Sequence, residues 1–148
     1  MATLEFREIN SENRKACENL DAGDNGKFVA SNKYSIDEKS FITKWDKKAV
    51  YYENEMVGFV MYNISYLKRE LYLCRFMIDK KHQGKGYGLE VLKELRNIAE
   101  KNNRVSKLRL STNPLNENGI RIYKKFGFRD TGKMDHGEEV FEYNLNKR

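Results

Sequence analysis

Apolar and polar residues alternate at the start of the chain, which predicts a first β-strand over residues 3–9. A helix is expected over residues 11–20, and the polar, glycine-containing run at 21–26 predicts a turn or mobile loop. A Ser-x-x-Glu sequence follows, with the spacing of a capping box, and predicts a second helix that starts at Ser35 and extends to about Trp45. One strand and two helices are therefore expected in the first third of the chain.

Apolar runs dominate the middle of the chain and predict three strands. The runs at 49–53 and 56–66 flank a short polar turn, as in a β-hairpin, and residues 71–79 form a further apolar run. This third strand leads into a glycine cluster at 84–88, after which apolar residues at helical spacing predict a helix over 89–98. Strand, glycine turn and helix thus follow one another directly.

The last third of the chain predicts a strand over 105–111 and a helix over 116–126 that ends at Gly127. Two further strands, at 128–133 and 140–145, are expected to form a closing hairpin. The order of these elements places the chain in the α/β class, with about four helices and a mixed, mostly antiparallel sheet.

Composition favours one folded domain over residues 1–148. The chain is 39% hydrophobic and 12% aromatic, unlike disordered segments, and its one proline marks no internal boundary. The longest uncharged stretch, 56–67, is shorter than the roughly 18 residues of a membrane span, so no membrane partner is expected. Acidic residues stand near the start of the chain, where a secretory signal has an apolar core, and this favours a cytoplasmic location.

The two cysteines, Cys17 and Cys74, lie far apart, and neither belongs to a CxxC or CxxH motif. Neither a disulfide framework nor a zinc site is therefore expected, and both residues are interpreted as buried thiols. The sequence shows no other constellation of metal ligands, so no metal is expected.

Charge is distributed unevenly along the chain. The net charge is +6, which is compatible with an anionic partner such as nucleic acid, a membrane surface or a phosphorylated cofactor. Residues 1–60 carry 9 basic and 11 acidic side chains, whereas residues 61–148 carry 19 and 11. The two halves are therefore expected either to face different ligands or to present ordinary solvated surface. A compact basic helix, or a strand that interleaves basic and aromatic residues, would indicate RNA binding, and the sequence shows neither. No nucleic-acid partner is therefore expected.

The glycine cluster has the composition of an anion-binding turn. Glycines allow a ligand to approach the backbone closely, and the free N–H groups at a helix start favour a pyrophosphate. A dinucleotide fingerprint would require a third glycine where Leu89 stands, and a P-loop would require Ser or Thr after a Gly-Lys pair. Neither requirement is met, which disfavours a dinucleotide, ATP or GTP.

Residues 83–88 read Gln-Gly-Lys-Gly-Tyr-Gly and resemble Gln/Arg-x-x-Gly-x-Gly/Ala, the acyl-CoA pyrophosphate motif of the GNAT superfamily of N-acetyltransferases. The segment 116–128 resembles a second motif of that superfamily, in which an Asn is followed seven residues later by a Tyr and then by Gly-Phe. The resemblance implies a GNAT fold, in which a central pair of strands splays apart, and acetyl-CoA as the co-substrate. It also implies a homodimer, although the sequence indicates no interface.

Three shorter stretches are similar to those of bacterial spermine/spermidine N-acetyltransferases within this superfamily: 28–32 together with 35–36, 57–62 and 75–79. This narrower resemblance implies that a polyamine accepts the acetyl group. The other acceptors that stay open are a protein N-terminus, a lysine and an aminoglycoside. A non-enzymatic alternative is a CoA-binding sensor with idle catalytic machinery.

The resemblance also implies the residues that hold acetyl-CoA. In the family, the pantetheine arm pairs with the fourth strand as an added strand would, and backbone N–H groups of the glycine turn bind the pyrophosphate. The Asn of the second motif is expected to contact the pantetheine arm or to cap its helix. The implied cofactor residues are Phe76, Ile78, Gln83, Gly84, Lys85, Gly86, Tyr87, Gly88, Leu89 and Asn116.

Tyr123 occupies the position of the family's general acid, which protonates the departing CoA thiolate. A thiol ordinarily has a pKa of about 8.5 and a phenol about 10, so a nearby phenol can supply this proton at little cost. Direct attack of the amine on acetyl-CoA in a ternary complex is expected, without a covalent enzyme intermediate.

An alkyl ammonium has an ordinary pKa near 10.4, so the acceptor must lose a proton before it can attack. Several polyamine acetyltransferases place a glutamate near the middle of the fourth strand, where this chain has Leu73 or Cys74. The base therefore stays unassigned. The acids considered for binding the amine or taking its proton, directly or through water, are Glu70, Glu55, Glu53, Asp37 and Glu38.

Overall fold

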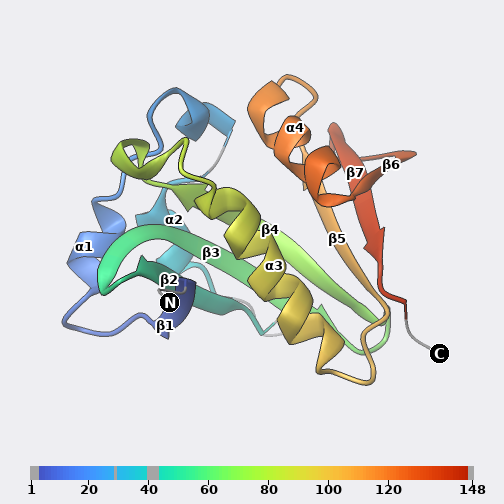
Figure 1. Ribbon diagram of the computed structural model, residues 1–148, viewed down its shortest axis with the longest axis horizontal. Coiled ribbons are helices and arrows are strands. Elements are labelled where there is room, and N and C mark those ends of the chain that lie inside the picture. Colours follow the sequence, from blue (N-terminus) through green and yellow to red (C-terminus); the bar gives the residue numbers. More distant parts are fainter. Residues whose placement is uncertain (1–3, 29, 40–43, 147–148) are drawn as a thin grey trace.

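The computed structural model describes residues 4–28, 30–39 and 44–146. The described residues form a seven-stranded sheet in the order β1-β2-β3-β4-β5-β7-β6 (Figure 1). The elements in chain order are β1 (Leu4–Glu8), α1 (Arg14–Glu18), the 3-10 helix η1 (Gly23–Phe28), α2 (Asn32–Asp37), β2 (Asp46–Tyr52), β3 (Glu55–Ser65), β4 (Glu70–Ile78), the 3-10 helix η2 (Lys80–His82), α3 (Tyr87–Glu100), β5 (Lys107–Thr112), α4 (Glu117–Phe126), β6 (Arg129–Asp135) and β7 (Glu138–Asn144).

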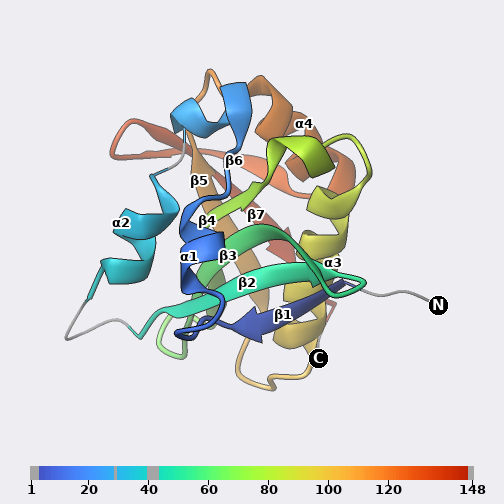
Figure 2. The ribbon, with the colours of Figure 1, turned by 90° about the vertical axis from the view of Figure 1, so that its left-hand side faces the viewer.

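Helices cover both faces of the sheet. On one face, α3 packs its apolar residues, among them Leu92 and Leu95, against the buried side chains of β2, β3 and β4. On the opposite face, α1 and α2 cover a smaller cluster that includes Phe59 and Met61. Figure 2 shows α1 and α2 on one side of the sheet and α3 on the other. Strand alternation explains this arrangement, because successive residues of β3 point to opposite faces.

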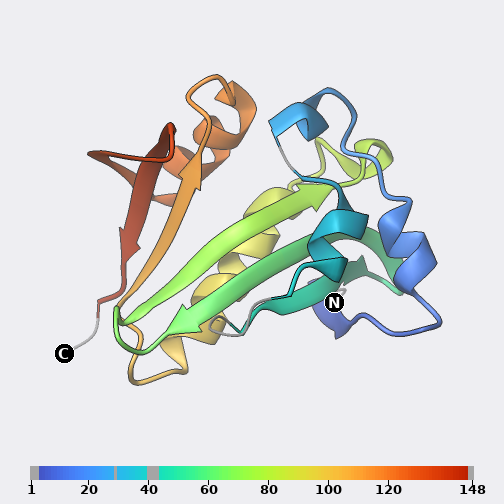
Figure 3. The ribbon, with the colours of Figure 1, turned by 180° about the vertical axis from the view of Figure 1, so that it is seen from behind.

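The strands β4 and β5 form the parallel pair of an otherwise antiparallel sheet, and they pair over only part of their length. Their register runs from Glu70↔Lys107 to Leu73↔Leu110, whereas β4 continues to Ile78 beside β3. Figure 3 shows the two strands diverging beyond their paired ends. The fold therefore has the splayed central pair that the resemblance implies, and one edge of β4 has no strand partner beyond Leu73 among the described residues.

The predicted strands are all present, with ends shifted by a few residues. The predicted β2–β3 hairpin turns at Glu53 and Asn54, which have φ of 50° and 67°. Positive φ at both central residues is typical of the turns that match the twist of a hairpin. The last two strands likewise form the predicted hairpin around His136 and Gly137.

The first predicted helix is too long, and the loop after it is more regular than expected. The helix spans only Arg14–Glu18, because the side-chain oxygens of Asn10 and Asn13 accept backbone hydrogen bonds and hold residues 10–13 in a turn. The stretch predicted as a turn or mobile loop forms the 3-10 helix η1 over Gly23–Phe28.

The prediction that a capping box at Ser35 starts the second helix is wrong. Helix α2 begins after Ser31, whose Oγ accepts a hydrogen bond from the backbone N–H of Tyr34 at 3.2 Å. Ser35 is buried inside the helix, and its hydroxyl donates to the carbonyl of Ser31 at 3.0 Å. The helix ends before Glu38, whose backbone is extended, and Trp45 directly precedes β2. The predicted helix also included residues 40–43, which lie outside the described residues.

None of the helices within residues 4–28, 30–39 and 44–146 is long and apolar enough to span a membrane.

Candidate active site

The turn between β4 and α3 presents backbone N–H groups at a helix start. Gly84 and Gly86 have φ of 79° and 87°, a conformation that L side chains rarely adopt. The first helical hydrogen bond runs from the N–H of Glu90 to the carbonyl of Gly86 at 3.2 Å. The N–H groups of Tyr87, Gly88 and Leu89 come before it and point out of the helix end, where the helix dipole also favours an anion.

Gly88 lies where two helices and the sheet meet. A Cβ there would lie 3.6 Å from the Ile122 side chain and 3.8 Å from that of Phe76, so α3, α4 and β4 meet at this residue.

The start of α4 is fixed by Asn116. Its side-chain oxygen accepts the N–H of Gly119 at 3.2 Å, and its amide donates to the hydroxyl of Thr112 at 3.0 Å. A Cβ at Gly119 would come within 2.4 Å of the Asn116 side chain, which explains the glycine. The capping role predicted for Asn116 is confirmed, and it ties α4 to the end of β5.

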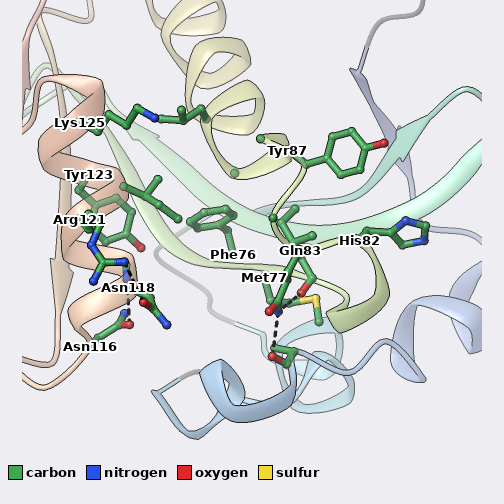
Figure 4. Close-up of a pocket in the computed structure, with 18 residues that line it drawn as sticks. Phe76, Met77, His82, Gln83, Tyr87, Asn116, Asn118, Arg121, Tyr123 and Lys125 are labelled. Atoms are coloured by element: carbon green, nitrogen blue, oxygen red, sulfur yellow. Dashed lines mark hydrogen bonds between the residues drawn. The ribbon is translucent and has the colours of Figure 1, made fainter.

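A cavity of about 520 Å³, called the first cavity below, lies between the start of α3 and α4. Figure 4 shows Phe76 and Gln83 on one side of it and the residues of α4 on the other. All the predicted cofactor residues line it except Lys85. The lining residues are Ala22, Phe76, Met77, Ile78, His82, Gln83, Gly84, Gly86, Tyr87, Gly88, Leu89, Asn116, Asn118, Gly119, Arg121, Ile122, Tyr123 and Lys125.

Two basic residues of the first cavity, Arg121 and Lys125, were missed by sequence reasoning. They stand four residues apart on α4 and so share one helix face. Arg121 donates to the side-chain oxygen of Asn118 at 3.3 Å (Figure 4). The helical spacing of these two cations within the second motif is the signal that could have identified them.

Hydrogen bonds attach the end of β4 to the loop before η1. The side-chain amide of Gln83 donates to the carbonyls of Ala22 and Ile78 at 2.9 and 2.8 Å. The buried carboxylate of Asp79 accepts the N–H of Asp21 at 2.8 Å. Gln83 therefore both lines the first cavity and holds its wall in place.

Tyr123 is buried at the inner end of the first cavity. Its ring packs against Phe76, Phe128 and Phe141, with ring centroids 6.1 to 6.4 Å away. Burial raises the pKa of the Tyr123 phenol well above its usual value, and the negative charge of Glu138 adds to this rise. The phenol therefore stays protonated, and able to donate its proton, across physiological pH.

A second cavity of about 330 Å³ opens at the diverging ends of β4 and β5. It shares Phe76, Asn116 and Tyr123 with the first cavity, so the two meet at the predicted general acid. Its lining residues are Ala30, Tyr72, Cys74, Arg75, Phe76, Ser111, Thr112, Asn116, Tyr123 and Glu138.

None of the acids predicted for the acceptor lines either cavity. Glu70 is buried at the far end of β4, where its carboxylate binds Arg109 at 2.9 Å. Glu55 lies at the start of β3, and its Oε1 is 3.4 Å from Nε2 of His82. The other acids pair with basic side chains or stand in a turn: Asp37 with Arg14 and Lys33, Glu38 with Arg75, and Glu53 in the β2–β3 hairpin.

No group of three or more potential metal ligands is found in the part of the chain that the structure describes.

Residues 5–128 match the model of the family described as "Acetyltransferase (GNAT) family". The chain is 30% identical over 146 residues to a protein named "Probable spermine N(1)-acetyltransferase" from Bacillus subtilis subsp. natto, with 93% of this chain and 96% of the relative covered. It is 29% identical, with the same coverage, to the "Spermine/spermidine N(1)-acetyltransferase" of Bacillus subtilis strain 168.

Solved structures show the same fold. The spermidine N-acetyltransferase from Vibrio cholerae, crystallised with CoA and spermine, superposes with a TM-score of 0.70 at 17% identity, covering 95% of this chain and 93% of that one. The PaiA N-acetyltransferase from Thermoplasma acidophilum, crystallised with CoA, gives a TM-score of 0.72 at 15% identity, covering 97% and 99%.

Proposed function

The chain belongs to the GNAT family of acetyltransferases, and from this premise we propose that it transfers the acetyl group of acetyl-CoA to a primary amine of a polyamine. Acetyl-CoA is the co-substrate, and the enzyme is an N-acetyltransferase. The polyamine acceptor is supported by the names of the two Bacillus relatives, which match nearly the whole chain.

The observation that carries the proposal is the meeting of two cavities at Phe76, Asn116 and Tyr123. Transfer between two substrates in a ternary complex requires two binding spaces that share a reaction point. The first cavity, with its outward N–H groups and basic side chains, suits the cofactor, and the second is left for the amine.

Two parts of the first cavity hold acetyl-CoA in this proposal. The N–H groups at the start of α3, together with Arg121 and Lys125, bind its phosphates by charge and hydrogen bonding. The edge of β4 beyond Leu73 offers main-chain groups to the pantetheine arm and stabilises the thioester oxygen as it gains negative charge. Phe76 and Ile78 contribute through their backbones.

Tyr123 is the proposed general acid. The amine loses one proton before it attacks, and its nitrogen lone pair forms the C–N bond. As the C–S bond breaks, the sulfur takes the proton of Tyr123, and the second proton of the nitrogen restores the phenol. One proton is released overall, and no covalent enzyme intermediate forms.

The test is release of CoA thiol from acetyl-CoA by the purified protein with each amine in turn. The panel is spermidine, spermine, short diamines, an aminoglycoside and a lysine peptide. We expect turnover with the polyamines at the highest kcat/KM. A higher kcat/KM for the peptide or the aminoglycoside would contradict the polyamine as acceptor and identify that class of amine instead. CoA binding without turnover on any amine would favour the sensor.

A cytoplasmic location and a homodimer stay predictions. Light scattering of the purified protein tests the homodimer.

A further inference from the structure

We propose that Glu138 binds a protonated amino group of the polyamine and thereby holds another, unprotonated amine of the same molecule, the one that attacks, near Tyr123. Glu138 lies at the start of β7 and lines the second cavity. The inference rests on the proposed function, because it assigns the second cavity to the amine.

Glu138 is the carboxylate of the second cavity, since none of the other described residues that line it carries an acid. An alkyl ammonium ion needs an anion or several acceptors when it leaves water, because burial of an unpaired charge is costly. The remaining polar side chains of this cavity are hydroxyls, an amide, a thiol and one guanidinium. A cationic acceptor that enters the second cavity therefore pairs with Glu138.

A short hydrogen-bond chain orients this carboxylate. The hydroxyl of Ser111 donates to Oε1 of Glu138 at 2.9 Å, and the Tyr72 hydroxyl lies 3.4 Å from the Ser111 oxygen. A serine hydroxyl has one hydrogen, so Ser111 accepts from Tyr72 while it donates to Glu138. The chain fixes Oε1 and leaves Oε2 and the remaining lone pairs for the acceptor.

Arg75, the one basic side chain among the described residues that line the second cavity, is occupied elsewhere. The Arg75 guanidinium donates to Oε1 of Glu38 and to the hydroxyl of Ser35, each at 3.3 Å, and lies over the ring of Tyr34. Glu38 therefore balances the charge of Arg75, and Glu138 is left to attract a cation.

Glu138 is also electrostatically linked to the general acid. Its negative charge contributes to the raised pKa of the Tyr123 phenol, after the larger effect of burial. An ammonium ion bound at Glu138 cancels that charge and makes the phenol a better proton donor. Arrival of the cationic acceptor would thus prepare Tyr123 for the transfer step.

The experiment compares Glu138→Gln with Glu139→Gln. The control removes the same charge from the next residue of β7, whose side chain points to the opposite face of the strand and does not line either cavity. The readouts are KM for spermidine, kcat, the dissociation constant of acetyl-CoA, and spermidine binding to the CoA-saturated protein by calorimetry.

Glu138→Gln is expected to weaken spermidine binding and raise its KM roughly 10- to 100-fold, the range for loss of a charged hydrogen bond. Acetyl-CoA affinity should stay as in the wild type, Glu139→Gln should match the wild type, and Glu138→Asp should recover part of the loss. Equal spermidine affinity in both glutamine variants would overturn the inference, and so would a parallel loss of acetyl-CoA binding in Glu138→Gln.

Failure of the proposed function is distinguishable from failure of this inference. Absence of turnover by the wild type on any amine contradicts the proposed function alone. The calorimetric comparison needs no turnover, so equal binding of spermidine by the wild type and Glu138→Gln contradicts the role of Glu138 alone.

Discussion

The first and second cavities meet at Tyr123 but are built in different ways. The first is formed largely by two continuous segments, 76–89 and 116–125, and the groups proposed to bind the cofactor there are mainly backbone N–H donors set by glycine conformations and helix ends. The second is lined mostly by residues of β4, β5 and β7, which come together through the register of the sheet. Backbone recognition suits an invariant co-substrate, whereas side chains can be exchanged to suit different acceptors.

Because the two cavities are built differently, we expect mutations in each to change a different kinetic or binding constant. Changes confined to the first cavity should alter the affinity for acetyl-CoA, and changes confined to the second should alter KM for the amine. Tyr123, which lines both, should affect the transfer step itself.

The largest effect is expected from Tyr123→Phe, which keeps the buried ring and removes the proton donor. We expect kcat to fall roughly 10²- to 10⁴-fold, the usual contribution of general acid catalysis. Steady-state kinetics measures this, with circular dichroism and acetyl-CoA binding as checks on folding. An unchanged kcat in a folded variant would refute the role of Tyr123.

Gly86→Ala tests the backbone-built cavity. Gly86 has φ of 87°, where a side chain costs about 1–2 kcal/mol, so the free turn should relax away from this conformation in the variant. Binding must then restore it, and acetyl-CoA should bind roughly 5- to 30-fold more weakly while the amine KM stays unchanged. Gly132→Ala is the matched control, because Gly132 has φ of 77°, open space around it and no place in either cavity. Equal acetyl-CoA affinities in the two variants, measured by calorimetry, would argue against the N–H groups of this turn as the phosphate site.

Ser111→Ala should have a smaller effect on the cavity built by side chains. It removes the hydroxyl that orients the Glu138 carboxylate but leaves the carboxylate's charge, so a loss of about 1 kcal/mol in amine binding is expected, which corresponds to a rise of roughly 5-fold in KM for the amine. The control is Ser106→Ala, just before β5, where the hydroxyl bonds the Arg69 carbonyl outside both cavities. A rise in the acetyl-CoA dissociation constant instead of KM would contradict the division of roles.

The smallest effect is expected in the pH dependence of kcat. Tyr123 should remain protonated, and so able to act as the acid, at alkaline pH. The raised pKa of Tyr123 means that its phenol ionises only above the usual value of about 10, so the acid form persists as pH rises from 7 to 10. With both substrates saturating, kcat should therefore show no falling limb in this interval. A clear decline between pH 8 and 9.5, with the fold intact, would contradict this assignment.

The sequence allowed the first cavity to be predicted because its chemistry is local. The conformations of two glycines, Gly84 and Gly86, and the helix cap at Asn116 depend only on neighbouring residues. A short sequence motif is therefore enough to predict each of these features. Glu138 carries no such signal, because it reaches the second cavity only through the pairing of β5 with β7 and its bond to Ser111. A glutamate beside a turn resembles any solvated acid in the sequence.

The misplaced second helix has a similar cause. Ser31 and Ser35 both offer a capping hydroxyl, and sequence spacing favoured the wrong one. A distant residue contacts the end of the actual helix, where the Lys47 ammonium donates to the carbonyls of Ile36 and Glu38. Tertiary hydrogen bonds of this kind leave no pattern within the segment itself.

The most direct test of the account measures the acetyl-CoA dissociation constant and the spermidine KM for the wild type, Gly86→Ala and Glu138→Gln. The division between backbone-built and side-chain-built cavities predicts that Gly86→Ala changes only the first constant and Glu138→Gln only the second. If either variant changed both constants to a similar extent while keeping its fold, the central claim would be contradicted.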